Sequence, residues 1–418
     1  MLNKDIFCNI PWTEVHINAD GTYHTCGAQL NTISNTKDAE IYNVYNMTIP
    51  EWINSEHQRL ARQHKLNGIR EPLCRMCYSE DSSGSISKRV KENLKSKISN
   101  LRFYEDYKQS PHHDMFEFSR IEGSTDNLQP YSYHLSLGNE CNLSCKMCDP
   151  TYSSRIAVEM IKAGTYQGPA RMNWTINDAA WNHVVEYICA TNDLRFVHII
   201  GGEPMMNPRF EDLIDCLIAA GKTDIYLGFT TNGTMVNIPL IEKLNVFRHV
   251  DIGVSVETVG RLNEVIRGGS RTQTVLDNID IYLKYRSESH VYVTLRAVPS
   301  ALSVHTLDEL YRWCIDRKLD VLTNMLTWPD YQQIRNLPPE IKTRLLGQYS
   351  AWEYSEPIPG ASDPRDPNRF REHIDNEIRD IINSLNQAGD PALTKELYSN
   401  LATWGWLADP EIKKYFEI

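Results

Sequence analysis

The chain has 418 residues, of which 41% are hydrophobic, and it carries a formal net charge of −11. This length leaves room for one to three domains with a buried core. The negative charge argues against a broad nucleic-acid-binding surface, which needs an excess of Lys and Arg. No run of about 18 apolar residues is present, so we expect no membrane-spanning helix. Residues 1–5 lack the apolar core of a secretory signal. We therefore expect a cytoplasmic protein whose ten cysteines are thiols or metal ligands and not disulfides.

The first 80 residues are rich in turns and short apolar runs. The pattern predicts a β-hairpin in which residues 15–18 and 22–25 pair across an Asp-Gly turn at 20–21, because glycine accepts the positive φ that a tight turn requires. A helix is predicted over 48–64 from its capping residues. Gly68 ends the helical pattern.

Four cysteines of this segment are predicted to converge. The hairpin places Cys8 and Cys26 at its two outer ends, and the helix returns the chain to Cys74 and Cys77. A four-cysteine set suits a fully ligated [4Fe–4S] cluster or a structural zinc site. The spacing of the cysteines does not separate these two kinds of site.

Residues 81–130 are expected to form a helical linker, after which strand and helix patterns alternate over 131–330. Such alternation predicts a parallel sheet with right-handed crossovers, and hence an α/β fold. Residues 331–418 have the amphipathic pattern of a helical C-terminal extension. The predicted strands are 132–136, 194–200, 225–230, 249–255, 290–297 and 319–325. The predicted helices are 153–163, 178–190, 208–219, 237–246, 271–285 and 305–317, followed by 338–350, 367–387, 391–403 and 410–416 in the extension.

A C-x3-C-x2-C spacing, formed by Cys141, Cys145 and Cys148, directly follows the first of these strands. In parallel α/β barrels the carboxyl ends of the strands carry the chemistry. A [4Fe–4S] cluster held only by protein usually takes four cysteine thiolates, so three on one loop leave one iron for another ligand. The alternative is a zinc site, since C-x2-C pairs are common zinc ligands.

Polar groups follow the later strands as well. The second strand ends in Gly201-Gly202-Glu203-Pro204, where a glycine pair lets the backbone approach a ligand and a carboxylate can receive an ammonium group. Asn232 ends the third strand, Ser255-Val256-Glu257 ends the fourth, and Arg267 comes ten residues after Glu257. A guanidinium suits a carboxylate ligand. A tight turn at 201–204 and a surface ion pair for Arg267 are the structural alternatives.

The cysteine spacing and the Gly-Gly-Glu-Pro run at 201–204 resemble the radical S-adenosylmethionine (SAM) superfamily. The resemblance implies a partial (β/α)6 barrel with a [4Fe–4S] cluster on Cys141, Cys145 and Cys148. It also implies that SAM chelates the open iron through its amino and carboxylate groups, and that residues 201–204 contact the amino group.

The resemblance extends to the other SAM contacts. It implies that Asn232 lies near the ribose or the methionine part of SAM and that Arg267 pairs with the SAM carboxylate. Ser255 and Glu257 are implied to lie near the ribose, although Glu257 replaces the aspartate that is usual in the family. Met147 stands where the family often has an aromatic residue near the adenine, and a thioether can pack on that ring.

Residues 1–80 resemble the twitch domain, the half-length relative of the SPASM domain that accompanies many radical SAM enzymes. Beside the cysteines, the resemblance rests on Pro11-Trp12, the Asp-Gly turn and the helix around Trp52. Twitch domains usually follow the radical SAM domain, whereas this segment precedes it. The resemblance implies an auxiliary [4Fe–4S] cluster on Cys8, Cys26, Cys74 and Cys77.

Together the two resemblances imply an enzyme with two [4Fe–4S] clusters and SAM, reduced by a flavodoxin- or ferredoxin-like partner. Reductive cleavage of SAM would give a 5′-deoxyadenosyl radical that abstracts hydrogen from a small-molecule or peptide substrate. A fully ligated auxiliary cluster favours electron acceptance, and so net oxidation by an oxidoreductase. The alternatives are a redox-neutral epimerase or rearrangement enzyme, an activase of a glycyl-radical partner, and a non-catalytic SAM- or metal-binding protein.

Three further cysteines, Cys189, Cys216 and Cys314, lie at apolar phases of predicted helices. Buried free cysteine behaves as a small hydrophobic residue, and this is the role we expect. The alternative is a thiol that donates a hydrogen atom, as an epimerase would need.

Overall fold

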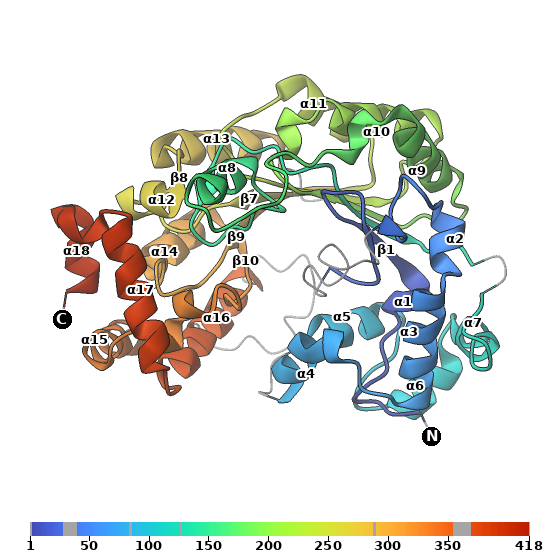
Figure 1. Ribbon diagram of the computed structural model, residues 1–418, viewed down its shortest axis with the longest axis horizontal. Coiled ribbons are helices and arrows are strands. Elements are labelled where there is room, and N and C mark those ends of the chain that lie inside the picture. Colours follow the sequence, from blue (N-terminus) through green and yellow to red (C-terminus); the bar gives the residue numbers. More distant parts are fainter. Residues whose placement is uncertain are drawn as a thin grey trace. The chain divides into compact units, whose positions relative to one another are not determined.

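The structure, a computed structural model, describes residues 2–27, 40–82, 86–125, 128–286, 290–353 and 369–417 (Figure 1). Residues 367 and 368, where a predicted helix was expected to begin, lie outside the described residues. The chain forms two compact units. The first contains Met1–Glu140, Gly168–Gly228 and Val246–Arg248, and the second contains Cys141–Gln167, Phe229–Asn245 and His249–Ile418.

The elements follow in chain order. The strands are β1 (Glu14–Ile17), β2 (Tyr23–His24), β3 (Ser132–Ser136), β4 (Ser144–Cys145), β5 (Phe196–Ile200), β6 (Tyr226–Thr231), β7 (His249–Ser255), β8 (Arg267–Gly268), β9 (Val291–Ala297) and β10 (Asp320–Thr323). The α-helices up to β3 are α1 (Ile10–Thr13), α2 (Ile49–Ile53), α3 (Glu56–Asn67), α4 (Arg75–Ser82), α5 (Lys88–Lys95), α6 (Phe103–Gln109) and α7 (His113–Phe118). Those that follow are α8 (Ser154–Lys162), α9 (Asp178–Ala190), α10 (Arg209–Ala219), α11 (Ile238–Leu244), α12 (Arg261–Ile266), α13 (Thr272–Tyr285), α14 (Leu307–Arg317), α15 (Pro339–Ser350), α16 (Arg369–Leu385), α17 (Pro391–Thr403) and α18 (Pro410–Phe416). Short 3-10 helices are η2 (Pro72–Cys74), η3 (Trp174–Ile176), η4 (Pro204–Met206), η5 (Asp330–Gln332), η6 (Ile334–Asn336) and η7 (Trp406–Ala408).

The alternating α/β pattern is confirmed. Each strand and helix predicted from residue 131 onward is present, with its ends within two residues of the predicted ones. The described strands pair mostly in parallel, as the alternation of strands and helices predicts. The protein therefore has a mostly parallel α/β sheet and a helical C-terminal region.

The predicted N-terminal hairpin is also present, and it belongs to the sheet of the first unit. β1 pairs antiparallel with β2, with His16 opposite His24, across a turn in which Gly21 has a φ of 85°. On its other side β1 pairs in parallel with β3, with Glu14 opposite Ser132. Since β3 pairs with β5, the strand order in this unit is β5-β3-β1-β2. The hairpin thus extends the parallel sheet and is not a separate layer.

The single helix predicted over 48–64 is wrong in one respect, because the structure has two helices there. α2 starts with a capping box between Thr48 and Glu51. A second helix, α3, starts after Ser55, whose Oγ accepts a hydrogen bond from the backbone N–H of Gln58 at 3.3 Å. A serine side chain at this position satisfies an N–H group that the first turn leaves free. Gly68 ends α3 with a φ of 69°, as expected.

The predicted linker packs against the N-terminal segment. Phe103 and Tyr107 of α6 and Phe116 of α7 share one buried cluster with Phe7 and Trp12. The rings of Trp12 and Phe116 meet edge to face at 5.1 Å between centroids, a favourable arrangement for aromatic side chains. The linker helices therefore form part of the core of the first unit.

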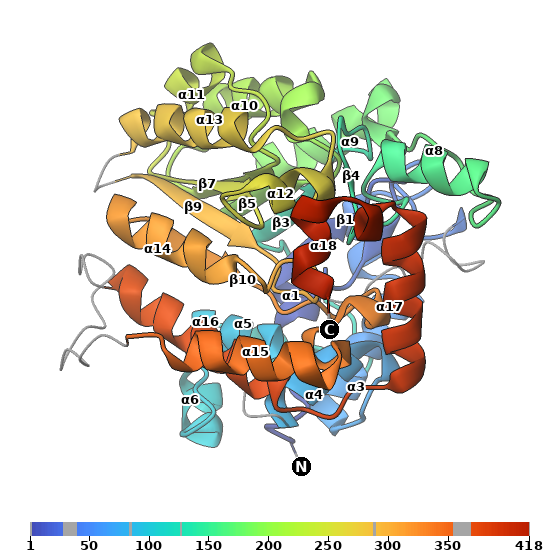
Figure 2. The same ribbon diagram turned by 90° about the vertical axis from the view of Figure 1, so that its left-hand side faces the viewer.

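In the second unit, β7, β9 and β10 pair in parallel in the order β10-β9-β7. The C-terminal helices α15–α18 belong to the same unit, and Figure 2 shows α16 beside α14 and α15. Ile374, Ile378 and Ile381 of α16 are buried, as the amphipathic pattern predicted. Within the described part of the chain, no helix combines the length and the apolarity that crossing a membrane requires.

His305, just before α14, lies against the C-terminal end of α18. Its ring meets Phe416 edge to face at 4.8 Å between centroids, and its Nε2 lies 3.0 Å from the carbonyl oxygen of Ala301. Burial, with a smaller contribution from Arg344, lowers the pKa of His305 to about 3. The imidazole is therefore neutral in the folded protein at neutral pH.

We expect this buried imidazole to make stability fall with acidification. The pKa of His305 in the folded state is below its unfolded value of about 6.5, so its contribution is complete above pH 6.5 and is lost as the pH falls from there towards 3. Between pH 7.5 and pH 5 the free energy of unfolding should therefore fall by about 2 kcal/mol through His305. Urea unfolding of wild type and His305→Gln at these two pH values measures this loss. An equal acid destabilisation of both proteins would contradict the prediction.

Candidate functional site

Four cysteines line a single cavity in the first unit. Cys8 precedes α1, Cys26 follows β2, Cys74 ends η2 and Cys77 lies in the first turn of α4. The sequence predicted this convergence, and the structure brings the four residues together. The rest of the lining is mainly apolar and includes Ile10, Pro11, Leu73 and Met76.

Burial makes the thiols of this cavity less acidic. It raises the pKa of Cys8 well above its usual value and raises the pKa of Cys77, although the backbone groups of Ile10 and Arg89 act in the opposite direction. Burial disfavours a free thiolate, and a bound metal reverses this because it requires the thiolate form.

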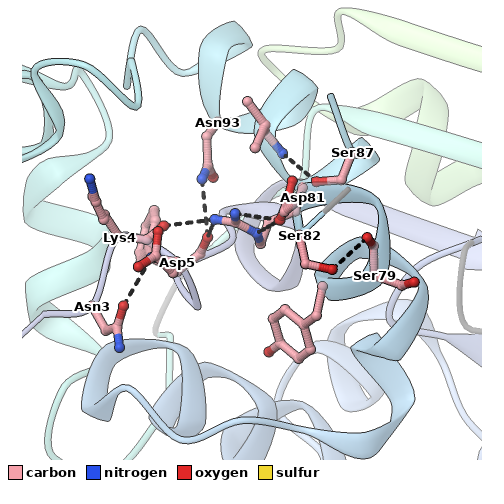
Figure 3. A network of polar contacts seen from close by, with 12 residues as sticks. Asn3, Lys4, Asp5, Ser79, Asp81, Ser82, Ser87 and Asn93 are labelled. Carbon is pink, nitrogen blue, oxygen red and sulfur yellow. Dashed lines mark hydrogen bonds and ion pairs between the residues drawn. The ribbon is translucent and has the colours of Figure 1, made fainter. Parts of the chain in front are cut away.

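Arg89 links the segment before Cys8 to helix α4. Figure 3 shows the polar network in this region, with Lys4, Asp81 and Asn93 labelled. Arg89 Nη1 donates to the carbonyl oxygen of Lys4 at 2.7 Å and to that of Phe7 at 3.1 Å. Its Nη2 lies 2.6 Å from a carboxylate oxygen of Asp81, while Asn93 Nδ2 donates to the same Phe7 carbonyl at 3.0 Å. The network joins the segment before the first cysteine to the helix that carries the fourth.

A buried lysine, which the sequence reasoning did not single out, touches one of the cysteines. Lys65 Nζ donates to Cys74 Sγ at 3.0 Å and pairs with Glu71 Oε2 at 2.6 Å. Its side chain is only 3% exposed. Lysine on an amphipathic helix normally faces water, so the sequence held no signal for this contact.

The second group of cysteines lies in the second unit, on the loop that follows Glu140. β4 pairs antiparallel with β8, which places Cys145 directly opposite Arg267. Lys146 N–H donates to the carbonyl oxygen of Ile266 at 2.8 Å and so continues this pairing. Ser153, the N-cap of α8, donates from Oγ to the carbonyl oxygen of Leu143 at 2.8 Å. The loop is therefore held to Ile266 through Lys146 and to the start of α8 through Leu143.

Arg267 is held in a buried ion pair. Its Nη1 donates to Glu257 Oε1 at 2.9 Å, and the other carboxylate oxygen of Glu257 accepts from Val298 N–H at 2.8 Å. Burial opposes the charge of Arg267, but the neighbouring Cys145 and Glu257 raise the pKa of its guanidinium above the usual range. The pair is not the surface ion pair considered as an alternative, since both side chains are nearly inaccessible.

This arrangement fits a negatively charged group at the cysteine loop. Arg267 Nε is buried and has no hydrogen-bond partner among the described residues. Cys145 and Cys141 are both close enough to act on the charge of Arg267. A guanidinium with donors left over beside three thiols suits an anionic cluster or a ligand carboxylate.

Asn232 reaches the same loop. Its Nδ2 donates to Asn142 Oδ1 at 2.7 Å and lies 3.8 Å from Cys141 Sγ, while its Oδ1 accepts from Thr234 N–H at 2.9 Å. It thus supports the loop directly. Of the other predicted residues, Met147 is half-buried on the loop, and Ser255 is half-buried at the end of β7.

The Gly-Gly-Glu-Pro run belongs to the first unit and packs on the residues just before Cys141. Gly201 and Gly202 have φ values of 88° and 53°. Glu203 N–H donates to the carbonyl oxygen of Glu140 at 2.8 Å, and its carboxylate accepts from Met205 N–H at 3.1 Å. Through this contact Glu203, which is 1% exposed, caps η4.

Gly202 is required by a close approach of two backbone segments. A Cβ at this position would lie 2.2 Å from the carbonyl oxygen of Glu140. We therefore expect Gly202→Ala to lower the urea midpoint and to displace residues 138–140. Gly221→Ala is the matched control, because Gly221 has a φ of 68° but no atom within 4 Å of an added Cβ. Equal losses of stability in the two variants would mean that only backbone strain matters.

The C-terminal region supplies two contacts that sequence reasoning missed. Gln332, which is fully buried, donates from Nε2 to the carbonyl oxygen of Lys146 at 2.7 Å. The Trp404 ring lies 5.5 Å from Lys146 Nζ, within the range of a cation–π contact. Both residues are more than 180 positions away in sequence, and no local motif marks them.

The remaining cysteines differ in exposure. Cys314 is fully buried in α14, as expected, and burial raises its pKa above the usual range. Cys189 is partly buried. Cys216 is exposed, so the expectation of burial is wrong there, because α10 turns this position away from the face that buries Leu213 and Leu217.

Two family models match parts of the chain. The radical SAM superfamily model matches residues 135–317, and the SPASM model, an iron–sulfur cluster-binding domain, matches residues 8–78. The segment that the SPASM model matches therefore precedes the segment that the radical SAM model matches, in the order that the sequence predicted. The radical SAM domain implies a [4Fe–4S] cluster and SAM as cofactors, and the SPASM domain implies a further iron–sulfur cluster. No curated protein matched the chain.

Several solved structures resemble the chain at low identity. Native anSMEcpe with bound AdoMet is 17% identical with a TM-score of 0.38, and the match covers 51% of this chain and 57% of that one. SuiB of Streptococcus suis bound to S-adenosylmethionine is 16% identical with a TM-score of 0.36, with 70% and 62% covered. The chain therefore spans less than two thirds of the length of these two relatives.

Proposed function

We propose that the protein is a radical SAM enzyme in which Cys141, Cys145 and Cys148 hold the SAM-binding [4Fe–4S] cluster. When bound, this cluster and SAM supply a 5′-deoxyadenosyl radical that abstracts hydrogen from a C–H bond. The observation that carries the proposal is the pairing of the cysteine loop with β8. It sets Cys145 opposite a buried arginine whose Nε has no partner among the described residues.

Arg267 is the residue we assign to the SAM carboxylate. Its Nη1 is committed to Glu257, which leaves Nε and Nη2 for a ligand. Glu257 is fully buried and uses both carboxylate oxygens inside the protein. We therefore assign Glu257 to the positioning of Arg267, in place of the ribose contact that the family resemblance implied.

The other SAM contacts keep the roles that the resemblance gave them. We assign the amino group to residues 201–204, the adenine to Met147 and the ribose to Ser255. Asn232 holds Asn142 and so fixes the cysteine loop. A direct contact of Asn232 with SAM would use the same side-chain amide that donates to Asn142.

We further propose that Cys8, Cys26, Cys74 and Cys77 hold one auxiliary [4Fe–4S] cluster of the twitch type. All four side chains line one cavity, which supports ligation of every iron by the protein. When bound, such a cluster supplies a one-electron acceptor or relay. This favours net oxidation of the substrate over a redox-neutral epimerisation or rearrangement.

This chemistry restricts the class of substrate. An oxidation needs a substrate radical that can lose an electron and a proton, as one next to an oxygen or nitrogen does. We propose a small molecule or a peptide with such a group. A flavodoxin- or ferredoxin-like protein of the cytoplasm would supply the electron that starts the reaction.

Iron and sulfide content after anaerobic reconstitution tests the proposal, with SAM cleavage by dithionite measured on the same sample. We expect about eight irons per chain, since each cluster carries four, together with 5′-deoxyadenosine. About four irons with zinc present would make the N-terminal site structural. A full iron complement without 5′-deoxyadenosine would favour a non-catalytic SAM-binding protein.

A further inference from the structure

Lys65 lies in the last turn of α3 with its ammonium group buried beside the auxiliary site. Nζ is 3.0 Å from Cys74 Sγ and 2.6 Å from Glu71 Oε2, and it lies 3.5 Å from Tyr78 Oη. Lys65 also belongs to the lining of the cavity that the four cysteines share. A buried positive charge therefore sits next to a sulfur that we assign as a cluster ligand.

The surroundings keep this ammonium charged. Burial alone would favour the neutral amine, but the Glu71 carboxylate, 2.6 Å from Nζ, favours the charged form. The other basic side chain of the cavity, Arg89, already pairs with Asp81 and donates to two backbone carbonyl groups. Of the two basic side chains in the described lining, Lys65 is therefore the one whose charged group touches a cysteine sulfur.

A fixed charge beside an iron–sulfur cluster changes how easily the cluster is reduced. Reduction of an iron–sulfur cluster adds negative charge, and hydrogen bonds to the sulfurs and nearby charges set how favourable that is. A buried ammonium stabilises added negative charge more than an exposed one, because water does not screen it. Glu71 acts in the opposite sense, since its carboxylate lies close to both Lys65 Nζ and Cys74 Sγ.

We propose that Lys65 raises the reduction potential of the auxiliary cluster through its contact with Cys74 and so makes this cluster an acceptor for the substrate's electron. The inference rests on the proposed function of the four cysteines. The balance is simple: the substrate radical loses one electron to the cluster and one proton to the medium, and the cluster is reduced by one electron. Lys65 is a tuning residue and touches no substrate.

Measurement of the potential in a chain that holds only the auxiliary cluster tests this. Cys141, Cys145 and Cys148 are replaced together by alanine, and the midpoint potential is determined by an anaerobic redox titration followed by electron paramagnetic resonance. In this background Lys65→Met should give a more negative midpoint potential, and Glu71→Gln a more positive one. Lys65→Arg, which keeps the charge and a donor, should stay close to the parent.

Lys95→Met is the matched control, because it removes a lysine of the same unit that is 55% exposed and paired with Glu92. It should leave the potential unchanged. An unchanged potential in Lys65→Met would overturn the inference, since a purely structural role of Lys65 would alter stability and not potential. If Lys65→Met does not retain its iron, Glu71→Gln decides: a positive shift supports the inference and an unchanged potential refutes it.

The iron content of the parent chain separates a failure of the proposed function from a failure of the tuning role. If the parent chain with three alanines binds no iron or binds zinc, the four cysteines do not hold a cluster, and the assignment of the site fails first. A bound cluster whose potential ignores Lys65 and Glu71 leaves the assignment intact and removes only the tuning role.

Discussion

Replacing Cys145 by alanine should abolish the reductive cleavage of SAM and reduce the iron content from about eight to about four per chain. Cys145 is one of three thiols on the loop, and the loop has no spare cysteine. Replacing Cys26 by alanine should also remove iron, but from the cavity in the first unit. Dithionite-driven formation of 5′-deoxyadenosine should survive in that variant, because the loop of the second unit is untouched.

Cys216→Ala is the control for both variants. Cys216 is exposed on α10, so its loss should change neither iron content nor SAM cleavage. The two sites would not be independent if Cys26→Ala lost 5′-deoxyadenosine formation while keeping the iron of the loop cysteines. Loss of cleavage in the Cys216 variant would contradict the assignment of the ligands.

The second large effect is expected at the buried ion pair. Arg267→Met should destabilise the protein by about 3–5 kcal/mol, because it leaves the Glu257 carboxylate buried without its partner. Both side chains are nearly inaccessible, at 10% and 1% exposure. The free energy of unfolding, from urea titrations of the chain without cofactors, measures this loss.

Arg248→Met is the matched control for this change, since Arg248 pairs with Asp224 at 2.9 Å on the surface. Exposed pairs contribute about 0–1 kcal/mol, so that variant should be close to wild type. Combining Arg267→Met with Glu257→Gln should restore part of the stability, because no unpaired charge then remains. Equal destabilisation by Arg267→Met and Arg248→Met would show that burial of the pair is not what matters.

Local sequence patterns were sufficient to predict most of the fold. Alternating apolar strands and amphipathic helices predicted the elements from residue 131 onward, because period and capping are properties of neighbouring residues. The division of the 48–64 helix was missed, although Ser55 is a good N-cap residue. The helical pattern runs through this position, and only the packing of two separate helices reveals the break.

The sequence by itself determined the two cysteine sets and the Gly-Gly-Glu-Pro run, because metal-ligand spacing and a glycine pair at a strand end are local features. Only the tertiary structure decided that β1 joins the parallel sheet beside β3, that Glu257 is committed to Arg267, and that Lys65 touches Cys74. Strand pairing and the burial of charged side chains depend on contacts between distant parts of the chain. A lysine on a helix carries no sign in its sequence of whether it faces water or a cluster of thiols.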